Sequence, residues 1–417
     1  MSDKLRYRSL RGMPDLLPED MAVMRWAEDK AREVFRLFGY SEIKTPHLEE
    51  TEVFTRSIGE DTDIVEKEMY SFTDRGGKNI SLRPEGTASI IRAYIEHGWH
   101  NTKGLVRLFY SGPMFRGERP QKGRLRQFNQ IGAEIIGASD PYIDAEIILN
   151  LNVLLRALNV KNSTILLNSL GCAKDRSAYQ KDLSAYLAGK SVRLCESCGK
   201  RLKTNVLRVL DCKRKECKDV VKDAPGVIGY LCKKCVTDYT SLKTILKEMK
   251  VPFTEKKDLV RGLDYYTGTI FEVTHPSLGS QDAIAAGGRY DGLSKQMGGP
   301  DTGATGYAIG VERLMLTVDR KKIQPHAPEV LVIAVDEAAA GYAFKAANEF
   351  RAENIPADMD LSGRSFKGQL RRAHKEGRRY VALVGEKEMK DGKITLKDME
   401  TGGQDTISLS EAIERVK

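Results

Sequence analysis

The sequence, 417 residues long, predicts an α+β protein with an inserted cysteine-rich segment and a smaller α/β domain at its C-terminal end. Two extended apolar segments enclose a basic loop within residues 113–137, a pattern typical of a β-hairpin. Six of the seven cysteines fall within residues 190–235, where thirteen lysine and arginine residues outnumber five acidic ones. After residue 329, short apolar strands alternate with helical segments, which indicates a small α/β domain.

The composition is that of a soluble globular protein, and its net charge favours a polyanionic partner without proving one. Hydrophobic residues make up 41% of the chain and charged residues 30%, both ordinary values, while the net charge is +9. The apolar runs, such as residues 330–335, are far too short to span a bilayer, and the first nine residues lack the apolar core of a signal peptide. We therefore expect a cytoplasmic protein without a membrane segment, whose cysteines are thiols or metal ligands.

Residues 18–39 are predicted to form an amphipathic helix, with a proline in the first turn and a glycine after the last. The chain is then extended up to Pro46 and helical beyond it. Further on, a strand leads into a helix that begins near Thr87, and Glu85 stands at this junction. An acid there is also consistent with simple stabilisation of the helix N-terminus. The core positions predicted for the first helix are Val23, Trp26, Ala27, Val34, Phe35 and Phe38.

The loop of the predicted hairpin carries five cations and one acid, Glu118. Guanidinium groups bind phosphate oxygens through paired hydrogen bonds, so cations on a rigid hairpin suit a polyphosphate. A solvated basic loop is the alternative. The five cations are Arg116, Arg119, Lys122, Arg124 and Arg126.

The remaining segments continue the α+β pattern. A helix over 143–158 and a strand over 163–168 precede the cysteine-rich segment, and glycine-rich strands occur within 259–273, 283–293 and 303–316. Two prolines in residues 321–328 indicate a linker. The C-terminal elements are predicted as strands at 330–335, 357–360, 380–385 and 394–399, with helices near 337–352 and 366–377.

The cysteine-rich segment contains two Cys-x-x-Cys pairs, and two such pairs complete a tetrahedral Zn²⁺ site. The predicted zinc ligands are Cys195, Cys198, Cys232 and Cys235. The gap between the pairs is longer than usual. A set that uses Cys212 or Cys217, metal-free thiols and a disulfide remain alternatives. Cys172 stands apart and is predicted to be a small buried residue.

Six stretches together resemble the bacterial type of histidyl-tRNA synthetase, a class II aminoacyl-tRNA synthetase. RGMPDLLPED lies near the start. EIKTPHLEE is similar to motif 1 of that class, FRGERPQKGRLRQFNQIGAE to motif 2, and AIGVERL to motif 3. LVRGLDYYTGTIFEV and GGRYDGL are similar to the signatures that distinguish the histidine enzymes.

The resemblance implies a mainly antiparallel sheet with helices, a homodimer formed through the motif 1 region, and a ligase that joins histidine to ATP and then to tRNA, with Mg²⁺ accompanying ATP. The implied domains are a catalytic core at 1–321, an inserted module at 170–240 within it, a linker at 322–328 and an anticodon-binding domain at 329–417.

The resemblance also implies roles for individual residues. Arg116 and Arg261 match the catalytic arginines on either side of the reacting atoms. The ATP-binding positions are Arg116, Glu118, Arg124, Phe128 and Arg313. The histidine-binding positions are Glu85, Thr87, Gln130, Glu134, Arg261, Tyr266 and Tyr290. Arg119 and Gln121 match positions near the 5′ end of the tRNA.

Simpler interpretations exist for several of these residues. Arg261 could form a surface ion pair, and Tyr266 and Tyr290 could be core aromatics. Residues 364–379 carry seven cations and one acid, which suits phosphate contact or a solvated helix face. At the level of function, the alternatives are a non-catalytic regulatory paralogue and a nucleic-acid-binding module.

Overall fold

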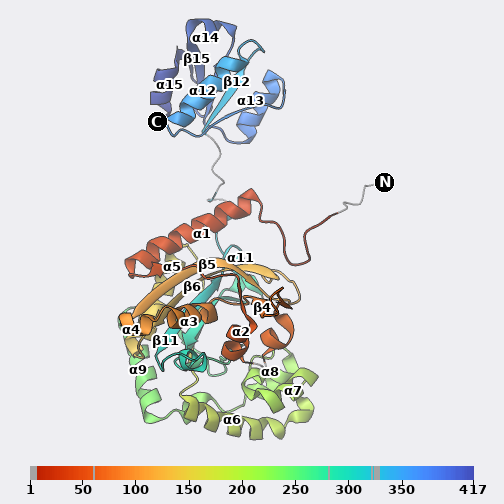
Figure 1. Cartoon of the computed structure of the whole chain (residues 1–417), viewed down its shortest axis with the longest axis vertical. Coiled ribbons are helices and arrows are strands. Elements are labelled where there is room, and N and C mark those ends of the chain that lie inside the picture. Colours follow the sequence, from red (N-terminus) through yellow and green to blue (C-terminus); the bar gives the residue numbers. More distant parts are fainter. Residues whose placement is uncertain (1–6, 60–61, 280–281, 321–322, 324–328) are drawn as a thin grey trace. The chain divides into compact units, whose positions relative to one another are not determined.

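The computed structural model describes residues 7–59, 62–279, 282–320, 323 and 329–417 (Figure 1). The chain divides into two compact units, Met1–Gln324 and Pro325–Lys417. Apart from Ile323, the linker predicted over 322–328 lies outside the described residues. Among the described residues, none of the helices combines the length and the apolar character that a membrane span requires.

The first unit is built on an eight-stranded, mainly antiparallel sheet, which is the architecture that the resemblance implies. Its strands are β1 (Ser41–Glu42), β5 (Val106–Phe115), β6 (Gln127–Ile136), β7 (Thr164–Ser169), β8 (Thr254–Glu255), β9 (Thr267–Thr274), β10 (Ala283–Arg289) and β11 (Ala304–Gly310). Their order across the sheet is β1-β5-β6-β11-β10-β9-β7-β8. Only the outer pairs, β1 with β5 and β7 with β8, are parallel.

The predicted hairpin is confirmed as β5 and β6, which pair from Val106 opposite Ile136 to Phe115 opposite Gln127. The loop between them is anchored to the N-terminal segment, because the amide of Arg126 donates to the carbonyl of Gly12 at 2.8 Å. Gly12 has a φ of +83°, and a Cβ there would lie 2.7 Å from Pro120. A glycine is therefore required where the N-terminal segment supports this loop.

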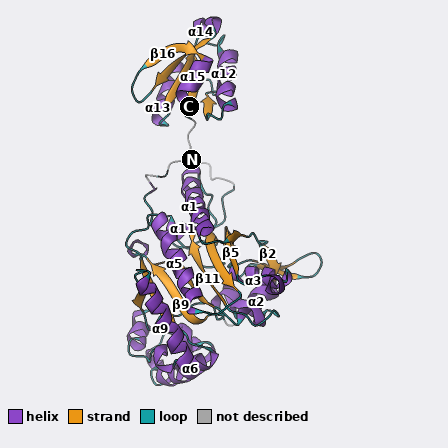
Figure 2. Ribbon diagram, turned by 90° about the vertical axis from the view of Figure 1, so that its left-hand side faces the viewer, coloured by secondary structure: helices purple, strands orange, loops and turns teal. Residues whose placement is uncertain are grey.

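Alternation along β6 assigns its two faces to different tasks. Ile131, Ala133 and Ile135 are buried in one hydrophobic core with helices α1 (Pro18–Leu37) and α5 (Pro141–Ala157). The residues between them face the other side of the sheet. Figure 2 shows α5 on one side of the strands, and α2 (Thr51–Ile58) and α3 (Thr87–Glu96) on the other.

The inserted module is a helical segment between β7 and β8. Its helices are α6 (Ala173–Ala188), α7 (Glu196–Thr204), α8 (Lys215–Val221) and α9 (Lys233–Glu248). The remaining elements of the first unit are short: β2 (Leu48–Glu50), β3 (Ser71–Thr73) and β4 (Asn79–Leu82), which form a small sheet, and α4 (Trp99–Thr102), α10 (Leu293–Gln296) and α11 (Val311–Leu314).

The second unit is the predicted α/β domain, with a five-stranded sheet in the order β13-β12-β14-β15-β16. Its strands are β12 (Val330–Ala334), β13 (Ala357–Met359), β14 (Tyr380–Val384), β15 (Lys393–Asp398) and β16 (Gln404–Ser408). Its helices are α12 (Ala340–Ala352), α13 (Phe366–Lys375), α14 (Glu386–Asp391) and α15 (Leu409–Val416).

Three of these C-terminal elements, α14, β16 and α15, have no counterpart in the sequence-based prediction. β16 is a partly exposed edge strand of mostly polar residues, so it lacks the apolar alternation that indicates a strand. The start of α15 had a readable signal. Ser408 and Glu411 form a capping box there, with the spacing that marks a helix N-terminus.

Candidate active site

A cavity opens on the face of the large sheet opposite α1 and α5, and ten of the predicted site residues line it. They are Glu85, Thr87, Arg116, Glu118, Arg124, Phe128, Gln130, Arg261, Tyr266 and Arg313. Glu134 and Tyr290 are fully buried and connect to this set through hydrogen bonds. Arg119 and Gln121 are exposed on the β5–β6 loop and do not line the cavity.

The β5–β6 hairpin and its neighbour α11 give the cavity a cationic wall. Arg116 donates through Nε to the carbonyl of Pro84 at 2.8 Å, and its guanidinium lies 5.3 Å from the ring centre of Phe128. Arg124 forms an ion pair with Glu118. Arg313 donates to the carbonyls of Gly123 and Ala283, each at 2.9 Å. These backbone contacts fix the side chains before any ligand is bound.

Arg261 reaches the cavity from the segment before β9. Its Nη1 lies 2.7 Å from Glu272, and its guanidinium lies 5.8 Å from the ring centre of Tyr266. The side chain is only 16% exposed, so this ion pair is not the surface pair considered as an alternative. Among the described residues, its buried Nε has no hydrogen-bond partner. A buried donor without a partner is costly, which makes Nε a natural contact for a ligand oxygen.

A buried polar pocket lies at the inner end of the cavity, around Glu134 on β6. The Thr87 hydroxyl donates to Glu134 Oε1 at 2.8 Å, and the Tyr290 hydroxyl donates to Oε2. Glu134 pairs across the strands with Gly306, where an added Cβ would lie 1.6 Å from Oε2. Only glycine at 306 therefore leaves room for this carboxylate.

Burial dominates the electrostatics of the pocket. It raises the pKa of Glu134 to about 8, despite the opposing hydrogen bonds from Tyr290 and Thr87. Burial also raises the pKa of Glu85, although the amides of Thr87 and Ala88 donate to its carboxylate at 2.7 and 2.8 Å. The pocket thus contains two carboxyl groups whose ionised form is disfavoured by burial and would be stabilised by a bound cation.

Glu85 both stabilises a helix N-terminus and faces the cavity. It caps the start of α3 through those two amides, and it also lines the cavity. Gln130 lies nearby, and its buried Oε1 lacks a hydrogen-bond partner within the part of the chain that the structure describes. Tyr266 and Tyr290 are buried with their rings 6.4 Å apart, in an edge-on arrangement. They are core aromatics and pocket residues at once.

Sequence reasoning missed several lining residues, of which Asp211 and Lys213 are the most informative. Both belong to the inserted module, and Lys213 Nζ lies 2.8 Å from Asp211 Oδ1. Asp211 and Lys213 flank Cys212 in the sequence, and this pattern was the signal from which they could have been predicted. The other missed carboxylates of the lining are Glu272, Asp282 and Glu312.

The predicted four-cysteine set is wrong, because the structure divides it between two clusters. Cys195 and Cys198 lie with Cys212 and Cys217; Cys212 is partly buried and the other three are buried, and their ligand atoms lie within 4.8 Å of one another. We name this group the buried cluster. The spacing argument failed because the chain after α7 brings Cys212 and Cys217 to Cys195 and Cys198, so the first Cys-x-x-Cys pair has partners other than the second pair.

The second Cys-x-x-Cys pair belongs to a different group. Cys232 and Cys235 lie with Cys172 and Asp175, again with ligand atoms within 4.8 Å of one another. We name this group the α6–α9 cluster. Cys172 is exposed, so the prediction of a small, isolated and buried residue was wrong.

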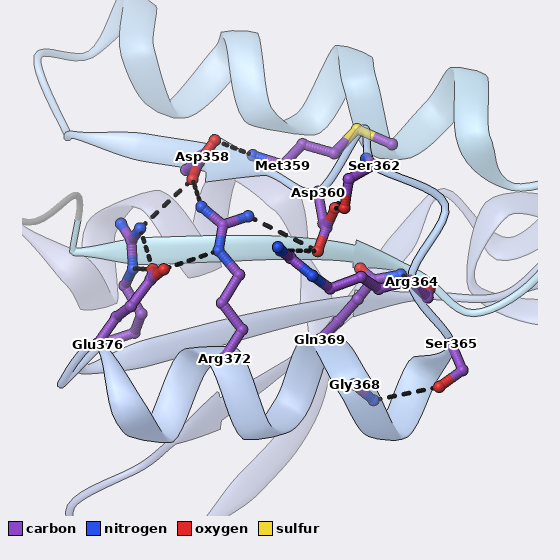
Figure 3. A network of polar contacts seen from close by, with 11 residues as sticks. Asp358, Met359, Asp360, Ser362, Arg364, Ser365, Gly368, Gln369, Arg372 and Glu376 are labelled. Carbon is purple, nitrogen blue, oxygen red and sulfur yellow. Dashed lines mark hydrogen bonds and ion pairs between the residues drawn. The ribbon is translucent and has the colours of Figure 1, made fainter. Parts of the chain in front are cut away.

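In the cationic segment of the second unit, residues 364–379, several arginines form ion pairs within the domain and are therefore less available to bind phosphate than the composition indicates. Figure 3 shows Arg372 reaching Asp358 and Glu376, at 2.6 and 2.9 Å, and Arg364 reaching Asp360 at 3.0 Å. Arg378 pairs with Glu376 and Asp358. In the described part of the chain, no salt bridge involves Lys367, Arg371 or Lys375, which are exposed and four residues apart on α13.

Comparison with known proteins gives consistent matches along the chain. A family model described as Histidyl-tRNA synthetase matches residues 12–314, and one described as Anticodon binding domain matches residues 329–417. The chain is 46% identical over 406 residues to the histidine–tRNA ligase of Syntrophotalea carbinolica, an alignment that covers 97% of each protein. It is 45% identical over 414 residues to that of Thermodesulfovibrio yellowstonii, with 99% of each covered.

A solved structure is similar over the same extent. The crystal structure of apo histidyl-tRNA synthetase from S. aureus matches with a TM-score of 0.81 and 33% sequence identity. The match covers 98% of this chain and 99% of that one.

Proposed function

The chain belongs to the histidyl-tRNA synthetase family, and we propose that the cavity described above is where it joins histidine to ATP and then to tRNA. The chain is thus a ligase that charges tRNA with histidine. In the first step the histidine carboxylate attacks the α-phosphorus of ATP, and pyrophosphate leaves. In the second step a ribose hydroxyl at the 3′ end of the tRNA attacks the carbonyl carbon, and AMP leaves.

The first step needs alignment and charge stabilisation rather than a general base, because the attacking carboxylate is already an anion. We assign Arg116 and Arg261 to the carboxylate and the α-phosphate. Arg116 is already fixed by the Pro84 carbonyl, and the unpartnered Nε of Arg261 offers a donor at the reacting atoms. Preorganised donors of this kind lower the barrier because they need not reorient during the reaction.

ATP would lie along the cationic wall. We assign Phe128 to stacking on adenine, Glu118 to the adenine edge, and Arg124 and Arg313 to the distal phosphates. The ion pair between Arg124 and Glu118 would have to rearrange as the phosphates arrive. Mg²⁺ would neutralise phosphate charge, and other carboxylates of the lining (Glu272, Asp282 and Glu312) could supply the oxygen donors that it prefers.

Histidine would enter the buried polar pocket. Glu134 and Tyr266 are assigned to the imidazole nitrogens, with Tyr290 holding Glu134 in place. Glu85, Thr87 and Gln130 are assigned to the α-ammonium group, which would satisfy the unpartnered Oε1 of Gln130. A pocket that leaves buried polar groups unpaired unless histidine is present rejects analogues strongly.

The observation that carries the proposal is this pairing of a cationic wall with a pocket of buried carboxyl groups in one cavity. We expect purified protein to catalyse ATP–pyrophosphate exchange only when histidine is added. The measurement is incorporation of labelled pyrophosphate into ATP with each of the twenty amino acids. Exchange that is absent, or equal with several amino acids, would contradict the proposal; a regulatory paralogue or a nucleic-acid-binding module would give none.

We also propose that Arg119 and Gln121 contact the 5′ end of the tRNA, because both side chains are exposed on the loop beside the cavity. Replacing Arg119 by alanine should then slow transfer to tRNA by about 10-fold or more, the effect of losing one or two charge-assisted hydrogen bonds. ATP–pyrophosphate exchange should stay within about twofold. The matched control is Lys122→Ala, which removes a neighbouring exposed cation without a proposed contact. Equal losses in both assays for Arg119→Ala would show that it serves ATP instead.

Three further proposals concern the tRNA, the second subunit and the location of the protein in the cell. The exposed stripe of Lys367, Arg371 and Lys375 on α13 suits phosphate contact near the anticodon. A homodimer through the motif 1 region is supported by the exposed edge strand β1 and by the exposed side chain of Leu48 nearby. A cytoplasmic location is supported by the free cysteines, since thiols persist in a reducing compartment.

Finally, we propose that the buried cluster holds a structural Zn²⁺. It offers four cysteine ligands, and the Sγ atoms of Cys195 and Cys212 lie 4.0 Å apart. Four thiolates at a Zn–S distance of about 2.3 Å would lie about 3.8 Å from one another, so the sulfurs already have nearly the required separation. The amide of Cys195 donates to Cys217 Sγ at 3.3 Å, a contact that supports a thiolate.

A further inference from the structure

The α6–α9 cluster is built from two helix starts that face each other. Cys172 precedes the first residue of α6, and Asp175 is the third residue of that helix. Cys232 and Cys235 occupy the same two positions at the start of α9. Each helix is sixteen residues long, so its N-terminal end carries a partial positive charge that points into the cluster.

The four side chains form a complete ligand set. Three thiols and one carboxylate have their ligand atoms within 4.8 Å of one another, and sulfur and carboxylate oxygen are both zinc ligands. Asp175 Oδ2 also accepts the amide of Cys172 at 3.3 Å, which orients the carboxylate toward the cluster. Once the three thiols lose their protons to a metal, their negative charges and that of Asp175 repel one another, and a bound cation offsets this repulsion.

We propose that the α6–α9 cluster is a second zinc site, separate from the buried cluster. Four protein ligands leave no open coordination position, so the ion is structural and not catalytic. It differs from the first site in having a carboxylate among its ligands and in lying at the protein surface, where Cys172 and Cys232 are exposed. Neighbouring Lys174, Lys233 and Lys234 offset part of the charge of the ligands.

The position of this site gives the ion a structural task. The ion would connect the start of α6, which follows β7, to the start of α9, which precedes β8. These are the helices through which the chain leaves the large sheet and returns to it. The start of α6 is also bonded to the segment that carries Arg261 and Tyr266. Arg176 donates to the carbonyls of Asp264 and Tyr266 at 3.2 and 3.0 Å.

Two backbone hydrogen bonds complete this connection. The amide of Leu170 donates to the carbonyl of Gly268 at 2.7 Å, and the amide of Gly268 donates to the carbonyl of Gly171 at 2.9 Å. The ion would therefore hold in place the segment on which the proposed histidine contact Tyr266 lies. Only this consequence for histidine rests on the proposed function; metal binding itself does not.

The test is metal analysis of the full chain purified without chelator, with variants that preserve the helices. Cys172→Ser and Cys232→Ser each remove a thiolate but place serine, a favourable capping residue, at the helix start. We expect two Zn²⁺ per chain in the parent and one in the double variant Cys172→Ser/Cys232→Ser. The matched variant Cys195→Ser/Cys198→Ser should also retain one, now at the α6–α9 cluster.

Replacing zinc by Co²⁺ shows which of the two sites is still occupied in each double variant. A four-thiolate site and a site with three thiolates and one carboxylate give Co²⁺ different thiolate charge-transfer absorption, so the two double variants should have different spectra. In the Cys172→Ser/Cys232→Ser variant, amide hydrogen exchange at Leu170 and Gly268 should become faster, and the KM for histidine should rise several-fold.

Three results would overturn the proposal. One is a parent with a single Zn²⁺ that Cys172→Ser/Cys232→Ser leaves in place; this would refute the second site and spare the first. Another is a parent without zinc. The third is a disulfide between two of the three cysteines of the α6–α9 cluster in protein kept under reducing conditions. In each case, histidine-dependent ATP–pyrophosphate exchange tests the ligase assignment independently of the metal site.

Discussion

Replacing Arg261 by alanine is expected to slow histidine-dependent ATP–pyrophosphate exchange by roughly 100- to 1000-fold, the usual effect of removing a preorganised donor at a charged transition state. Among the arginines that line the cavity, Arg261 is the one whose Nε has no partner within the described residues, so it is free for a ligand. Its guanidinium is held between Glu272 and the ring of Tyr266. Because this geometry is already in place, the loss should fall mainly on kcat, measured as the maximal exchange rate at saturating histidine and ATP.

The ion pair with Glu272 requires a further variant, since Arg261→Ala alone leaves a half-buried carboxylate without its partner. The double variant Arg261→Ala/Glu272→Gln removes both charges and should recover thermal stability without recovering exchange. Arg56→Ala removes a surface arginine that pairs with Glu52 and should leave exchange unchanged. Exchange by Arg261→Ala within fivefold of the parent would refute the assignment.

Glu134→Gln should weaken the use of histidine selectively. A hydrogen bond to a charged group contributes about 1.5–3 kcal/mol, which corresponds to a rise in the KM for histidine of roughly 10- to 150-fold. The KM for ATP should change little, because Glu134 lies behind the cavity lining and not on the cationic wall. Exchange kinetics with each substrate varied in turn measure both constants.

The same substitution should make the protein's stability less dependent on pH. The pKa of Glu134 is raised to about 8 in the folded chain, against 4.5 for the ordinary side chain. The folded state therefore binds this proton more tightly, so its contribution to stability is complete below pH 4.5 and is lost as the pH rises to about 8. Each unit of pKa difference corresponds to about 1.4 kcal/mol.

Melting temperatures at pH 5, 7 and 9 measure this effect. The parent should lose more stability than Glu134→Gln between pH 5 and 9, and the variant should melt higher than the parent at pH 9. Glu146→Gln serves as the control, since Glu146 is partly exposed and paired with Arg107. Parallel melting curves for parent and Glu134→Gln would refute a raised pKa at this position.

Local patterns predicted the hairpin beside the cavity, whereas the roles of the cavity residues come from the family resemblance and stay predictions. The β5–β6 hairpin follows from two apolar strands around a loop with turn residues, and strand alternation then separates the core residue Ile131 from the pocket residue Glu134. Local patterns did not predict contacts between residues that are far apart in the sequence. Gly306, which leaves room for the Glu134 carboxylate, lies in a strand about 170 residues away.

The cysteines illustrate the same limit. Two Cys-x-x-Cys pairs indicated one shared ion, but spacing along the chain does not specify which helix starts meet. α6 and α9 start beside each other, so Cys232 and Cys235 meet Cys172 and Asp175 instead of Cys195 and Cys198. A Cys-x-x-Asp at 172–175, with the spacing of a Cys-x-x-Cys pair, was the available signal. It becomes meaningful only when the two helices are placed together.

Because of the strand order of the first unit, strands that are neighbours in the sheet beside the cavity are synthesised at different times. β6 is hydrogen-bonded to β5 on one side and to β11 on the other, and β11 is about 170 residues further along the chain. At a synthesis rate of about 5–20 residues per second, the ribosome completes β11 roughly ten to thirty seconds after β6. During that interval the edge of β6 that pairs with β11 is unpaired, while the helices of the inserted module emerge from the ribosome. The histidine pocket is therefore one of the last parts of the first unit to form during translation.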